Sequence, residues 1–286
     1  MSVADMAAIW FFAGAALLLA ALALGYLRWW RSLADLSRAA RVTLILTTVG
    51  GLIGAVFWWQ DMPASFAWDL PPLASRMLGA AATAFGIAGL FVLERPTQAR
   101  GRLHALVSAI YLIPLAVAAI ALHLDRFDLA APISWGFFAA VGVLSISAVV
   151  ALSADRGGAP RSLVFAGQSA WLLVAGTLLA LWGLALFLAP ATAFPLVFNW
   201  PADALTSRLI AAMLLTVAAA FLVARGDAPL VPQALLLGAV YGLGVVIAIV
   251  PNMLRGLPWP PLYLAAFAVL GIVSAGFLLA GRARAG

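Results

Sequence analysis

Long apolar stretches separated by short polar connections follow one another along almost the whole chain. A helix needs about 20 predominantly apolar residues to cross a bilayer. Stretches near that length occupy residues 7–27, 42–59, 73–93, 103–122, 133–152, 163–189, 205–224, 230–250 and 262–280. They take up most of the 286 residues, of which only 9% are charged. The sequence therefore predicts an all-α integral membrane protein with nine transmembrane helices and no soluble domain.

The basic residues indicate the orientation of these helices. All 16 are Arg, and Lys and Arg collect in cytoplasmic loops. Four lie on one predicted side, namely Arg76, Arg126, Arg208 and Arg255, and the other twelve lie opposite. This asymmetry predicts a cytoplasmic C-terminus and an outside N-terminus. An Arg-only composition rich in Ala and Leu is typical of bacteria with GC-rich genomes, so we expect the bacterial cytoplasmic (inner) membrane.

One short motif occurs twice. Phe66, Trp68, Leu73, Ser75 and Arg76 recur as Phe198, Trp200, Leu205, Ser207 and Arg208, each 132 residues further on. Each copy belongs to a set of four predicted helices. Because four is even, both sets enter the membrane in the same direction, which predicts parallel repeats related by a pseudo-two-fold axis along the membrane normal.

The duplication also suggests how the chain is divided. The expected parts are an N-terminal transmembrane helix with a basic inner loop (1–41), a first repeat (42–154), an inner linker (155–162), and a second repeat with a basic tail (163–286).

The two motif arginines occupy an unfavourable place for a cation, at the outer start of a helix. They could extend to lipid phosphates while Trp68 and Trp200 fix the depth of the helix ends. Alternatively, Arg76 and Arg208 could hold one anion or lipid headgroup between them, with the Trp residues covering an apolar tail and Ser75 and Ser207 beside it. Ion pairs are the third possibility, with one of Asp61, Asp69, Asp125, Asp128 and Asp203.

Aromatic and polar residues within the spans carry weaker signals. Trp residues gather at the predicted outer ends, where they indicate either interfacial anchors or a groove for a lipid. Tyr111 and Tyr241 are matched by the repeat at a spacing of 130 residues. They are expected to join helix to helix, or to line a polar path inward from the arginines.

Several kinds of chemistry have no residues to support them. Cys is absent and only two His are present, which excludes thiolate sites and multi-histidine zinc sites. A metal at His123, Asp125 and Asp128, or a cofactor held by His104 alone, has little support, so we expect neither metal nor cofactor. The charge of +6 reflects loop arginines, and nucleic acid is not an expected partner.

The sequence favours a non-enzymatic protein, since no group of catalytic residues or buried ion-coupling carboxylates emerges. We expect a structural or accessory subunit of a membrane assembly, or a lipid-binding module, with membrane lipids and other membrane subunits as partners. The alternative is a small transporter or flippase for an anionic amphiphile, with its site on the outer side between the repeats.

Overall fold

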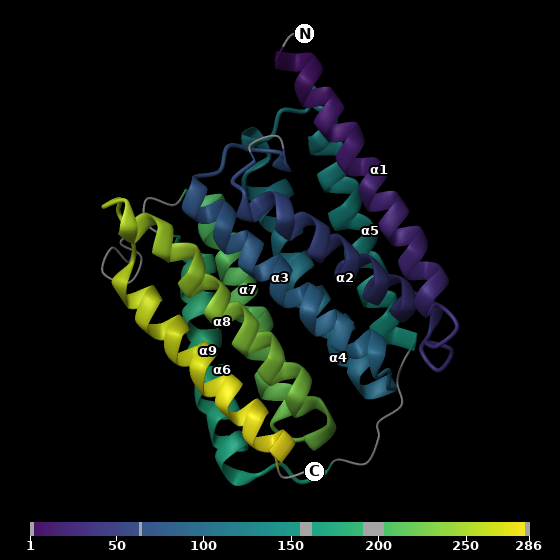
Figure 1. Cartoon of the computed structure of the whole chain (residues 1–286), viewed down its shortest axis with the longest axis vertical. Helices are drawn as coiled ribbons and strands as arrows, with labels where there is room; N and C mark the ends of the chain where they lie inside the picture. Colours follow the sequence, from purple (N-terminus) through teal and green to yellow (C-terminus); the bar gives the residue numbers. More distant parts are fainter. Residues whose placement is uncertain (1–2, 63–64, 155–161, 191–202, 284–286) are drawn as a thin grey trace.

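The structure is a computed structural model that describes residues 3–62, 65–154, 162–190 and 203–283. The side chains of residues 3–12, 282 and 283 lie outside this description. Helices joined by turns and short loops make up the described part of the chain, which contains no strand (Figure 1). Its helices are α1 (Val3–Trp29), α2 (Arg38–Trp59), α3 (Pro72–Glu94), α4 (Gln98–Ala116), α5 (Pro132–Ala154), α6 (Ala166–Leu188), α7 (Ala204–Ala224), α8 (Val231–Leu254) and α9 (Pro261–Ala283).

Several helix ends are set by local capping chemistry. The Ser37 hydroxyl accepts a hydrogen bond from the Ala40 N–H at the start of α2, and Thr97 does the same for Arg100 in α4. Asp203 caps α7 by accepting from the Thr206 N–H at 2.9 Å. Such side chains satisfy N–H groups that have no partner inside the helix.

Eight helices, α2 to α9, are long and apolar enough to cross a membrane, which confirms the multi-pass prediction for these spans. In α1, side chains are described only from residue 13 onward, and the apolar stretch 13–29 is shorter than the eight spans. The ninth span therefore stays a prediction. α1 begins at one end of the molecule and α9 finishes at the other (Figure 1). The side of the membrane on which each terminus lies also stays a prediction.

Two helices, α3 and α7, form the centre of the bundle, and most of their residues are buried. α3 packs against α2 and α8, while α7 packs against α6 and α4. α5 covers α4, and α9 covers α8. The outer helices expose large apolar side chains to the surroundings, such as Ile146 at 67% and Leu178 at 61%. An apolar exterior of this extent suits contact with lipid.

Small residues allow the closest helix crossings, as the strings Gly79–Gly86 and Gly238–Gly244 suggest. A Cβ at Gly86 would stand 2.6 Å from Leu52 of α2. At Gly244 it would stand 2.8 Å from Ala80 of α3. The predicted linker at 155–162 falls almost entirely outside the described residues, and the division into repeats stays a prediction.

Candidate functional site

Arg76 lies in the first turns of α3, and its guanidinium is buried in the protein. The residue is 5% exposed. Its Nη1 donates to the Asp61 carboxylate at 2.7 Å, and its Nη2 donates to the Asn252 side-chain oxygen at 2.6 Å. Its Nε donates to the Ala248 carbonyl at 3.2 Å. Arg76 therefore connects α3 to the last turns of α8 and to the loop after α2.

The loop after α2 brings the counter-ion to Arg76. Asp61 has a φ of 54°, a left-handed conformation that Asp adopts more readily than most residues. Burial raises the pKa of the Asp61 carboxyl, and the neighbouring Arg76 charge acts in the opposite direction. Ser75 secures the same junction by donating its hydroxyl to the Trp58 carbonyl at 2.7 Å.

Arg208 lies in the first turns of α7 and has uncharged partners among the described residues. Its Nε donates to the Phe187 carbonyl at 3.1 Å. Its Nη1 hydrogen-bonds the Nε2 of His123, which must accept because guanidinium can only donate. Arg208 thereby connects α7 to α6 and to the segment that follows α4.

That segment owes its shape to Pro114, which lies inside α4. Proline lacks an N–H and clashes with the preceding turn, so it disturbs a regular helix. The chain continues as a π-helix over Val117–Leu122 and ends at His123. Burial, and then the Arg208 charge, lower the pKa of His123, whereas Asp125 and Asp203 raise it. The net direction is downward, which keeps the imidazole a neutral acceptor for Arg208.

The two arginines thus have separate sets of protein partners. The sequence left three interpretations of the motif arginines open. For Arg76, the structure contains one of them, the ion pair with Asp61. Its burial places the guanidinium inside the bundle and away from the lipid-facing surface. Binding of an anion or lipid headgroup by Arg76, Arg208, Ser75 and Ser207 stays a prediction.

A large apolar cavity lies beside this junction, and sequence reasoning missed it. Its volume is about 540 Å³, within the range of roughly 300–1,000 Å³ common for ligand sites. Residues from α1, α2, α3, α4 and α5 line it, together with the loop after α2 and Leu209 of α7. None of the lining residues is charged.

Much of this space lies between α2 and α5. Near one end the helices are joined by the Thr43 hydroxyl, which hydrogen-bonds that of Ser147 at 2.9 Å. Toward the other end, cavity-lining residues run along α2 from Leu46 to Trp58 and along α5 from Ile133 to Leu144. Glycines widen the space, because Gly50 and Gly136 line it and a Cβ at either would meet no atom within 4 Å.

Aromatic side chains cover the end of the cavity nearest the motif. The Trp68 ring lies 5.3 Å from that of Phe127, 5.5 Å from Phe137 and 5.8 Å from Phe66, measured between ring centroids. Trp68 is buried, and its indole N–H has no partner within the described part of the chain. A buried indole N–H usually finds an acceptor. The unpaired indole N–H is therefore an unusual feature of a residue that lines the cavity.

The remaining predicted site residues separate into three groups. Tyr111 lines the cavity, as Trp68 does. Tyr241 is buried in the core against Phe267, and Ser207 is buried at the start of α7. Trp200 lies outside the described residues. Asn252 was missed by sequence reasoning because a single amide near a helix end forms no recognisable pattern.

Within the described ranges, no group of three or more His, Asp or Glu side chains is placed to hold a metal ion. Comparisons with known protein families, with characterised proteins and with solved structures give no match for this chain.

Proposed function

We propose that this protein is a non-enzymatic membrane protein that binds the hydrocarbon chain of a membrane lipid in the cavity between α2 and α5. The observation that carries the proposal is the uncharged cavity of about 540 Å³ within a bundle of membrane-spanning helices. An apolar chain would fill this space without leaving buried charge unpaired.

The covering aromatic cluster supports the same occupant. Indole and phenyl rings pack well against methylene chains. In contrast, the rings of Trp182, Tyr263 and Phe267 pack directly on one another between α6 and α9, with centroids of Trp182 and Tyr263 4.8 Å apart. The first four-helix set would then carry the binding function and the second would act as its support.

The arginine contacts support a parallel-repeat organisation as part of this proposal. A two-fold axis along the membrane normal would exchange α3 with α7 and α4 with α8. The α3–α8 and α4–α7 pairings exchange under that operation. So do the two arginine contacts, since Arg76 reaches the end of α8 and Arg208 reaches the segment that follows α4. In this proposal the motif arginines fasten each half to the other.

A transporter or flippase for an anionic amphiphile is the second candidate. One observation favours it: Leu209 lines the cavity, while the adjacent Arg208 has only uncharged hydrogen-bond partners among the described residues. A phosphate headgroup at Arg208 could accompany a chain in the cavity. Reconstituted vesicles with a labelled anionic lipid test this candidate: accelerated movement between leaflets that Arg208→Gln abolishes favours transport, and no acceleration favours the lipid-binding proposal.

Filling the cavity tests the lipid-binding proposal directly. Gly136→Phe projects a ring from α5 into the cavity, where a Cβ meets no neighbour. We expect purified Gly136→Phe protein to retain several-fold less lipid per chain than wild type when extracted lipids are quantified by mass spectrometry. Gly142→Phe is the matched control, because Gly142 lies on α5 in open space but does not line the cavity. Equal lipid retention by the two variants would contradict the proposal.

A further inference from the structure

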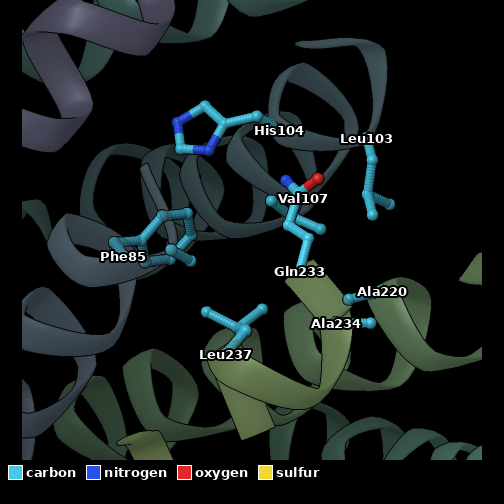
Figure 2. Close-up of a pocket in the computed structure, with 9 residues that line it drawn as sticks. Phe85, Leu103, His104, Val107, Ala220, Gln233, Ala234 and Leu237 are labelled. Atoms are coloured by element: carbon cyan, nitrogen blue, oxygen red, sulfur yellow. The ribbon is translucent and has the colours of Figure 1, made fainter. Parts of the chain in front are cut away.

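A second, very small cavity lies between α4 and α8, deep in the bundle. Its volume is about 10 Å³, at the lower limit of the roughly 10–15 Å³ that one water molecule requires. Gln233 extends from α8 toward α4, from which His104 projects (Figure 2). The remaining lining is apolar and includes Phe85, Val107 and Leu237.

Two of the residues that line this cavity each carry a polar atom without a partner. These atoms are the Nδ1 of His104 and the side-chain oxygen of Gln233, and neither has a hydrogen-bond partner in the described part of the chain. Both residues are almost fully enclosed, with exposures of 1% and 3%. Buried polar atoms are nearly always hydrogen-bonded to protein or to ordered water. Two such atoms, on residues that line the same water-sized cavity, therefore favour a shared partner.

The neighbouring hydrogen bonds determine what that partner must do. Thr47 donates its single hydroxyl proton to the Thr43 carbonyl at 2.7 Å. The contact of 2.7 Å between Thr47 Oγ1 and His104 Nε2 must then be donated by the imidazole. The proton of the neutral ring consequently lies on Nε2, and Nδ1 presents a lone pair.

Gln233 presents an acceptor as well. Its amide nitrogen donates to the Arg100 carbonyl at 3.4 Å, and its oxygen is the atom left without a partner. The bridging molecule must therefore donate two hydrogen bonds, one to Nδ1 and one to the amide oxygen. Water has two donor protons and the right size. A metal cation finds a single oxygen ligand here, far fewer than hard cations require.

We propose that one internal water molecule occupies this cavity and donates to both His104 Nδ1 and the Gln233 side-chain oxygen. The water extends a hydrogen-bonded chain from Thr43 and Thr47 on α2, through His104 on α4, to Gln233 on α8. It ties together helices that belong to different predicted halves, and it stands independently of the lipid-binding proposal.

Solid-state NMR on histidine-labelled protein in lipid bilayers tests this proposal. The chain has two histidines, so His123→Gln leaves the His104 signals alone for assignment. We expect an imidazole protonated at Nε2, with magnetisation transfer from water protons to the unprotonated Nδ1. In Gln233→Leu, which removes one acceptor, this transfer is lost. Gln168→Leu is the matched control, because Gln168 lies on α6 away from the cavity.

Three results would overturn the proposal: a His104 ring protonated at Nδ1, no transfer from water in the wild type, or undiminished transfer in Gln233→Leu. The wild-type spectrum decides the first two without any substitution at Gln233. If Gln233→Leu fails to fold, Gln233→Met keeps the length of the side chain without its oxygen and decides the third.

Discussion

At the scale of single residues, the two motif arginines differ in charge balance although their sequence contexts match. Arg76 is neutralised by Asp61, at 2.7 Å, while Arg208 relies on a carbonyl and a neutral imidazole among its described partners. A buried guanidinium without a counter-ion is costly, and Arg208 is accordingly the more exposed of the two. The Arg76 contact is therefore expected to contribute more to stability, and the Arg208 contact to respond more to pH.

Arg76→Lys should destabilise the protein although it conserves the charge. An ammonium group can pair with Asp61, but it lacks the planar fork that also reaches Ala248 and Asn252. We expect a loss of about 2 kcal/mol, visible as a lower unfolding temperature in detergent. Arg126→Lys, at an exposed position after α4, serves as the control. Equal melting of Arg76→Lys and wild type would show that the contacts to α8 contribute nothing.

The contact between Arg208 and His123 should make stability fall in acid. Burial and Arg208 lower the pKa of His123 below that of the unfolded chain. The unfolded state therefore takes up the proton first as the pH falls below about 6.5. Stability from this contact is complete above that pH and declines until the folded-state pKa is passed. Unfolding temperatures of wild type and His123→Gln, compared between neutral and acidic pH, should converge on acidification, and parallel curves would contradict the prediction.

At the scale of helices, glycine contacts determine which pairs approach most closely. α8 and α9 meet where Gly242 faces Gly271, and a Cβ at Gly242 would lie 2.5 Å from the Gly271 nitrogen. The obstructing atom belongs to the backbone, so no side-chain rotation can relieve the clash. α9 would have to move away from α8 as a unit.

Gly242→Ala should for this reason be destabilising, by about 1–3 kcal/mol as expected for overpacking. Gly276→Ala on α9 is the control, since a Cβ there meets nothing within 4 Å. The difference can be measured as the unfolding temperature of the two variants in the same detergent. If Gly242→Ala melts no lower than Gly276→Ala, the α8–α9 crossing is looser than described.

The helices themselves could be predicted from the sequence because bilayer thickness fixes their length, whatever their packing. The expected span at 73–93 matches α3 at Pro72–Glu94, and that at 205–224 matches α7 at Ala204–Ala224. The π-helical turn after α4 could not be predicted. Pro114 marks a disturbance of the helix, but its effect on the chain as far as His123 depends on tertiary contacts.

At the scale of the whole molecule, the repeated motif lies beside the candidate site and supplies only part of its walls. Trp68 lines the cavity, whereas Arg76 turns away toward α8. The cavity itself depends on how α2 and α5 pack together, which no sequence periodicity predicts. His104 lies buried between α2 and α8, where its ring contacts Thr47 and lines a small cavity with Gln233. Its partners Thr47 and Gln233 are far away in the sequence.

A density map of the protein in native lipid at side-chain resolution is the most direct test for a lipid chain in the cavity between α2 and α5. We expect elongated non-protein density between Gly50 and Gly136, extending toward the Trp68 ring. A map in which α2 and α5 close together, or in which the cavity is empty while lipid is resolved around the outer helices, would contradict the claim.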